Sequence, residues 1–98
     1  MNITMNRVDN ELTVALEGRL DTLTSPELEE QLEPALVGVE KLIFDFAELQ
    51  YISSAGLRVL LTAMQVMDEQ GTMVVRNVCD EVRDVFEITG FIDDLTIE

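Results

Sequence analysis

Two adjacent hydroxyl residues, Ser53 and Ser54, lie between an apolar segment and a segment with helical periodicity. Apolar residues downstream recur at spacings of three and four, which predicts a helix over about residues 55–69. A hydroxyl at a helix start lies beside unpaired backbone N–H groups and the positive end of the helix dipole, where a negative group is tolerated. These serines therefore favour acceptance of a phosphate, and the alternative that they only cap the helix remains open.

The segment before the serines, Lys41–Phe46, is mostly apolar and predicts a central strand covered on both faces. A loop between such a strand and a helix lies at the carboxyl end of the strand, where open α/β sheets carry their sites. Ala55 and Gly56 would let another backbone approach this loop closely, which favours an interaction site.

A second loop, Arg19–Thr22, follows a strand that Gly18 is expected to end. If that strand is parallel to Lys41–Phe46, Asp21 reaches the same end of the sheet as Ser54 and could orient a hydroxyl or repel a phosphate. Alternatively, Asp21 only hydrogen-bonds its own loop backbone. Exposed residues of the helix after Ser54 form either a docking face or an ordinary solvated surface: Arg58, Thr62, Gln65 and Glu69.

The remaining patterns predict an N-terminal β-hairpin, a helix that Ser25 caps, a strand over Thr72–Arg76 and a last helix that Asp80 caps. The predicted order is β-β-α-β-α-β-α, a mixed sheet flanked by helices in one α/β domain over residues 1–98. All five glycines are expected at element boundaries, and Gly71 is expected to end its helix in the left-handed conformation.

Composition excludes several functions. The net charge of −14, from twenty acidic and six basic residues, argues against binding to nucleic acids or anionic membranes. The absence of histidine rules out a Ser-His-Asp hydrolase, and neither standard phosphate loop occurs. No metal, cofactor or enzymatic activity is predicted. No signal peptide or membrane span is visible, so we expect a cytoplasmic protein that is a monomer when free.

In combination, four segments resemble the STAS domain, which occurs in bacterial anti-sigma factor antagonists and in sulphate transporters. The resemblance covers nearly the whole chain, and the length is similar to that of a free-standing antagonist. The segments are Gly18–Asp21, Leu42–Phe46, Tyr51–Leu57 and Val85–Phe91.

The resemblance implies a protein that binds an anti-sigma factor with serine kinase activity and so releases a sigma factor. The kinase phosphorylates a serine at the helix start and the complex dissociates, and a metal-dependent serine phosphatase restores binding. By position in the family motif, that serine is Ser54, with Ser53 as the alternative acceptor. Ser53 stands where well-known members have Asp, and Ala55 where they have a second hydroxyl.

The resemblance also implies a partner surface around the hydroxyl loop: Asp21, Ser53, Ser54, Ala55, Gly56, Arg58 and Thr62. One alternative is an accessory or scaffold STAS subunit of a transport or stress-signalling assembly, which uses the same surface without phosphorylation. A small nucleotide-binding module is disfavoured because the phosphate loops are missing.

Overall fold

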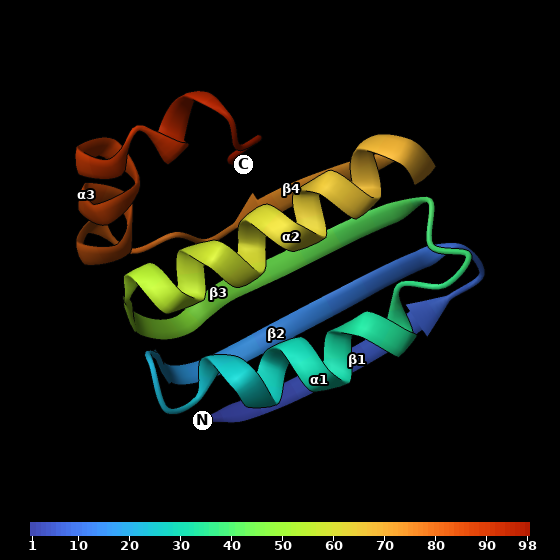
Figure 1. Ribbon diagram of the computed structural model, residues 1–98, viewed down its shortest axis with the longest axis horizontal. Coiled ribbons are helices and arrows are strands. Elements are labelled where there is room, and N and C mark those ends of the chain that lie inside the picture. The colour runs from blue at the N-terminus through green and yellow to red at the C-terminus, as the bar shows by residue number, and fades with distance from the viewer.

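The chain folds as a four-stranded mixed sheet with three helices (Figure 1), and a computed structural model describes all residues 1–98. The predicted order β-β-α-β-α-β-α is confirmed. The elements are β1 (Asn2–Val8), β2 (Glu11–Leu20), α1 (Ser25–Ala35), β3 (Lys41–Ile52), α2 (Ser54–Gln70), β4 (Thr72–Arg76), α3 (Asp80–Thr89) and a 3-10 turn (Phe91–Asp93).

The strand order in the sheet is β1-β2-β3-β4. β1 and β2 form the predicted antiparallel hairpin, whose two-residue turn contains Asp9 in the left-handed region at φ 55°. β2 is parallel to β3, and β3 is parallel to β4, so α1 and α2 are the crossover connections between parallel neighbours. The carboxyl ends of β2, β3 and β4 therefore point toward one end of the molecule.

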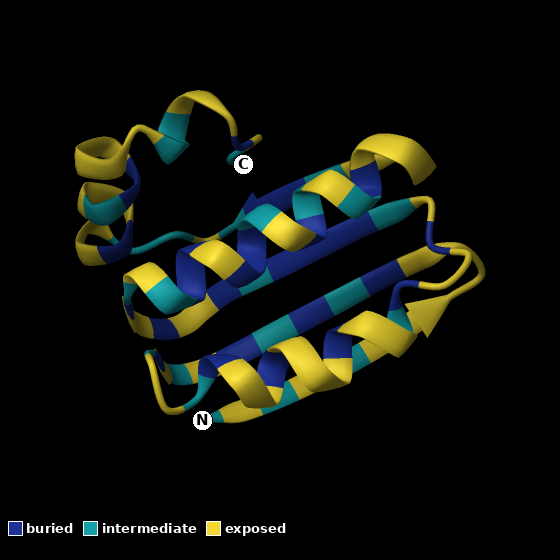
Figure 2. Ribbon diagram, in the orientation of Figure 1, coloured by how far each residue is buried: buried dark blue, intermediate teal, exposed yellow.

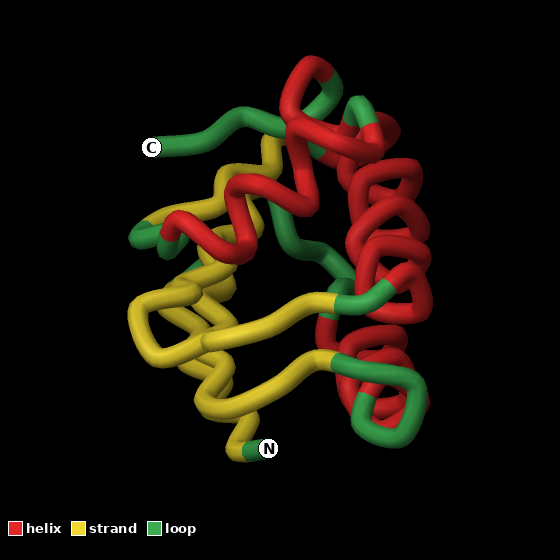
Figure 3. Tube along the Cα trace, turned by 90° about the vertical axis from the view of Figure 1, so that its left-hand side faces the viewer, coloured by secondary structure: helices red, strands yellow, loops and turns green.

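The helices α1 and α2 cover only one face of the sheet, and the other face carries no helix (Figure 3). Figure 2 places the buried residues along the strands and on the helix stripes that face them. Leu42, Phe44 and Phe46 alternate toward this core. The prediction that β3 is covered on both faces is therefore wrong. Ile43 points away from the helices and is only 2% exposed, because its sheet neighbours surround it.

β3 is twice as long as the predicted strand and continues to Ile52. β4 pairs only with its first half, Lys41–Asp45. Beside the second half lies the start of α3, where the Cys79 thiol donates to the Leu49 carbonyl oxygen at 3.5 Å. α3 thus takes the place of a strand next to the end of β3, at the same end of the molecule as the α2 N-terminus (Figure 1).

Two glycines do not lie at element boundaries as predicted. Gly18 lies inside β2, at a register irregularity and at φ 108°, a conformation that L side chains rarely adopt. Gly56 lies in the first turn of α2. Gly71 does follow α2 but is extended, not left-handed. It is needed because a Cβ there would lie 1.9 Å from the Glu40 carbonyl oxygen.

The predicted caps of α1 and α3 are also corrected. Thr24 precedes α1, and Ser25, its first residue, is buried and donates its hydroxyl backward to the Asp21 carbonyl at 2.6 Å. Cys79 precedes α3, so Asp80 lies in the first turn. Near the C-terminus, Ile97 pairs with Val75 as an isolated parallel bridge. No helix has the length and apolarity needed to cross a bilayer.

Candidate functional site

The carboxyl ends of β2 and β3 lie side by side and bring the two predicted loops together. Leu20 is the register partner of Ile52, and the Ser53 backbone N–H donates to the Leu20 carbonyl at 2.9 Å. The condition that the sequence left open, a parallel arrangement of these strands, is therefore met. The loop after β2 and the hydroxyl loop after β3 form one rim at this end of the sheet (Figure 1).

The two serines have different environments at the start of α2. Ser53 is the N-cap, half-buried, and its hydroxyl accepts from the Gly56 N–H at a long 3.5 Å. Ser54 is the first helical residue and is exposed, which confirms the predicted accessibility. The first turn of α2 contains no acidic residue. A negative group on Ser54 would therefore face the positive end of the dipole without a carboxylate in that turn to oppose it.

Gly56 is buried, which contradicts the prediction that it forms part of a partner surface. A Cβ at this position would lie 2.8 Å from side-chain atoms of both Leu20 and Ile52. The space that glycine leaves is filled by the chain's own core and not by a partner. Gly56 thus lets the first turn of α2 approach the ends of β2 and β3, and the half-buried Ala55 lies beside it.

Asp21 turns its carboxylate into its own loop and not toward a ligand. Its Oδ1 accepts from the backbone N–H groups of Leu23 at 3.0 Å and Thr24 at 3.1 Å. The Thr24 hydroxyl accepts from the Asp21 N–H at 2.9 Å and donates to the Arg19 carbonyl at 2.8 Å. The geometry corresponds to the alternative in which Asp21 organises its own backbone.

The hydrogen bond from the Thr24 backbone N–H is the main cause that lowers the pKa of Asp21 below its ordinary value of 3.8. Removal from water opposes this effect. Bonds from the Leu23 N–H and the Thr24 hydroxyl and the charge of Arg19 reinforce it. The ionised form is therefore favoured in the folded chain.

We expect the Asp21 contribution to stability to disappear in acid. Because the folded pKa lies below the unfolded one, the contribution is fully present above the unfolded pKa and is lost as pH falls through the folded pKa. Asp21→Asn should melt below wild type at pH 7, and the difference should shrink below about pH 4. Melting curves of both proteins between pH 7 and pH 2 measure this. A gap that stays constant across the range would contradict it.

Three side chains of this rim were not predicted from the sequence. The Arg19 guanidinium lies 4.2 Å from the centroid of the Tyr51 ring, and its Nε is 4.0 Å from Asp21 Oδ2. Tyr51 is 37% exposed, and Leu23, between Asp21 and Thr24, is 88% exposed. The register pair Arg19–Tyr51 depends on the irregularity at Gly18, which no local pattern in the sequence indicates.

The predicted strip on α2 lies on the solvent side of the helix. Arg58, Thr62, Gln65 and Glu69 are all exposed, and the Thr62 hydroxyl donates to the Arg58 carbonyl at 3.0 Å. Arg58 lies one helical turn after Ser54, so it is a cation on the exposed side of the hydroxyl loop.

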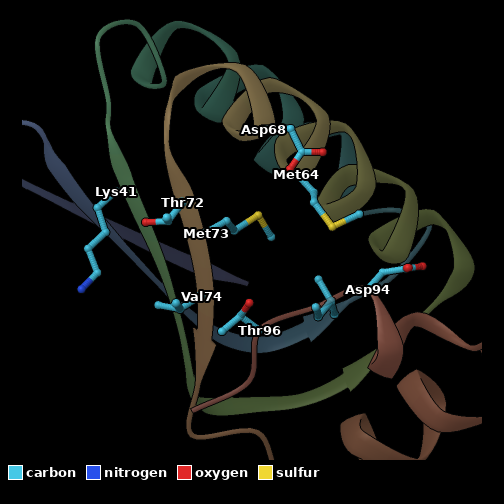
Figure 4. Close-up of a pocket in the computed structure, with 9 residues that line it drawn as sticks. Lys41, Met64, Asp68, Thr72, Met73, Val74, Asp94 and Thr96 are labelled. Carbon is cyan, nitrogen blue, oxygen red and sulfur yellow. The ribbon is translucent and has the colours of Figure 1, made fainter.

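A cavity of about 320 Å³ lies elsewhere, beside β4, and contains none of the predicted site residues. In Figure 4, Met64 and Asp68 from α2 lie across from Met73 and Thr96, and Lys41 points away. Asp68 and Asp94 supply its acidic groups. An opening with carboxylates and no inward cation is unsuited to the phosphates of a nucleotide.

Comparison with known proteins gives a family match and close relatives. A family model described as STAS domain matches residues 2–98. BtrV of Bordetella bronchiseptica, named as an anti-sigma factor antagonist, is 39% identical over 94 residues, which covers 94% of this chain and 81% of BtrV. The anti-sigma-B factor antagonist of Staphylococcus aureus is 30% identical over 95 residues, covering 95% and 88%.

The fold is also that of SpoIIAA, an anti-sigma factor antagonist and Bacillus cell fate determinant solved in two forms. Its unphosphorylated form matches with a TM-score of 0.79 at 19% identity, covering 99% of this chain and 87% of SpoIIAA. Its phosphorylated form matches with a TM-score of 0.77 at 19% identity, covering 99% and 91%. The fold of this chain is therefore similar to both forms of SpoIIAA.

Proposed function

The chain belongs to the STAS domain family, and from that premise we propose that it is an anti-sigma factor antagonist whose binding is switched by phosphorylation of Ser54. In this proposal the unphosphorylated chain binds an anti-sigma factor with serine kinase activity and frees a sigma factor in the cytoplasm. A metal-dependent serine phosphatase reverses the modification. The chain itself acts as a binding module without catalysis, cofactor or metal.

The observation that carries the proposal is the exposed Ser54 at the first position of α2. A kinase needs an accessible hydroxyl, and Ser54 offers one on a helix start that tolerates negative charge. The Ser53 hydroxyl is engaged as a cap and the residue is half-buried, which makes it the less favourable acceptor. The relatives named as antagonists match nearly the whole chain and support the antagonist function.

A phosphate on Ser54 would change the surface and leave the fold intact. Phosphoserine carries about −1.5 to −2 charges and three acceptor oxygens. Beside the α2 N-terminus that charge is compatible with the folded domain, and SpoIIAA keeps a fold similar to that of this chain in its phosphorylated form. Against a partner surface the same charge must lose water, so the complex weakens.

The test of this function is a binding measurement with two forms of the chain. The ligand is a recombinant anti-sigma factor with a serine kinase domain from the same organism as this chain. We expect the unphosphorylated chain to bind it and to displace its sigma factor in size-exclusion chromatography, and the phosphorylated chain to do neither. A chain that binds in neither form, or binds equally well in both, would contradict the proposal.

A further inference from the structure

Leu23 is the most exposed large apolar side chain of the protein, at 88%. A single exposed leucine is ordinary on a protein surface and has no meaning alone. Leu23, however, lies in the loop between β2 and α1, at the end of the sheet where Ser54 is presented (Figure 1). The order of its loop and its position near Ser54 give this side chain its significance.

The backbone around Leu23 is fixed on both sides by hydrogen bonds. Its own N–H donates to the Asp21 carboxylate at 3.0 Å. The Ser25 hydroxyl and the Ser25 N–H both donate to the Asp21 carbonyl, at 2.6 and 2.9 Å, and Ser25 is buried. A backbone already ordered in this way loses little further entropy when a partner covers the side chain that it carries.

The loop that carries Leu23 is joined directly to the hydroxyl loop. The Leu20 carbonyl accepts from the Ser53 N–H at 2.9 Å, and Leu23 follows three residues later. Three residues span at most about 11 Å of chain. A protein surface that covers Ser54 is wide enough to cover Leu23 as well, because a standard interface buries roughly 800 Å² on each partner.

We infer that Leu23 is an apolar anchor by which the chain docks to its anti-sigma kinase, inserting into an apolar pocket of that protein next to the Ser54 contact. The inference rests on the proposed function and adds a specific contact to it. Asp21 is then a positioning residue, which holds the Leu23 backbone through the carboxylate bond.

The test compares Leu23→Ser with Val37→Ser, a matched loss of an apolar side chain that is 73% exposed near the opposite end of the sheet. We expect Leu23→Ser to raise the Kd for the recombinant anti-sigma kinase roughly ten-fold or more, since burial of a leucine is worth that much. It should raise the KM of Ser54 phosphorylation and leave kcat unchanged, because the acceptor hydroxyl is untouched. Val37→Ser should change neither.

Melting temperatures of both variants should equal that of wild type, because both side chains are exposed. If wild type binds the kinase and Leu23→Ser binds it equally well, Leu23 is not an anchor, and the proposed function still stands. An equal loss of binding in both variants would overturn it too, since the effect would not be specific to this rim. Wild type that does not bind the kinase would overturn the proposed function and the anchor with it.

Discussion

Ser54→Ala should abolish phosphate incorporation by the cognate kinase, whereas Ser53→Ala should still take up one phosphate per chain. Ser54 is exposed and its hydroxyl has no hydrogen-bond partner within the chain, but the Ser53 hydroxyl accepts from the Gly56 N–H. A phosphate on Ser53 would displace that cap, and a phosphate on Ser54 displaces nothing. Intact-mass spectrometry after incubation with kinase and ATP measures both variants.

Ser53→Ala also supplies the control for folding. Loss of an N-cap hydroxyl costs about 0.5–2 kcal/mol, and the long bond here places the cost near the lower limit. The variant should therefore melt slightly earlier than wild type and still be phosphorylated. Phosphate that persists in Ser54→Ala and disappears in Ser53→Ala would move the switch to Ser53.

The sequence predicted the elements well because each has a strong local signal. The alternation of Leu12, Val14 and Leu16 and the turn residues before it predicted the hairpin, and the strand Thr72–Arg76 is confirmed residue for residue. The same signals placed Ser54 at a helix start. The order of the elements and the exposed hydroxyl could therefore be predicted from the sequence alone.

What the sequence did not predict depends on contacts between distant residues. Gly18, Gly56 and Gly71 look alike as local signals, but they serve a strand irregularity, a tight contact with Leu20 and Ile52, and a close approach to Glu40. These needs arise only when the strands pair and the helices pack on them. No window of local sequence contains both members of such a pair.

Prediction of the site from the sequence was limited by the same lack of tertiary information. Asp21 was expected at the end of the sheet where Ser54 lies only if the two strands are parallel, a condition that the structure meets. Whether its carboxylate faced a ligand or its own loop remained open. The choice is made by the Leu23 and Thr24 N–H groups, whose direction depends on how the chain enters α1. Leu23 was overlooked because a lone leucine in a polar loop carries no periodic signal.

Ser54→Asp should weaken binding to the anti-sigma partner about a hundredfold or more and leave the folded domain nearly as stable as wild type. The carboxylate lies at the favourable end of the α2 dipole, an effect worth about 0.3–1 kcal/mol if it contributes. In the complex the same charge loses its water, and an unpaired buried charge costs roughly 3 kcal/mol or more, about a hundredfold in Kd. The loss at the interface therefore exceeds the gain in the free domain.

Two further variants separate the charge from its position and its size. Asn10→Asp adds the same charge in the exposed hairpin turn at the opposite end of the sheet, and Ser54→Asn adds similar bulk without charge. Calorimetric Kd values should place Ser54→Asp far above both variants, with all melting temperatures close together. If Ser54→Asp melts much earlier, Ser54 is mainly structural. If it melts normally and binds as tightly as wild type, the partner does not cover Ser54 and the switch must lie elsewhere, because a buried unpaired carboxylate cannot be without cost.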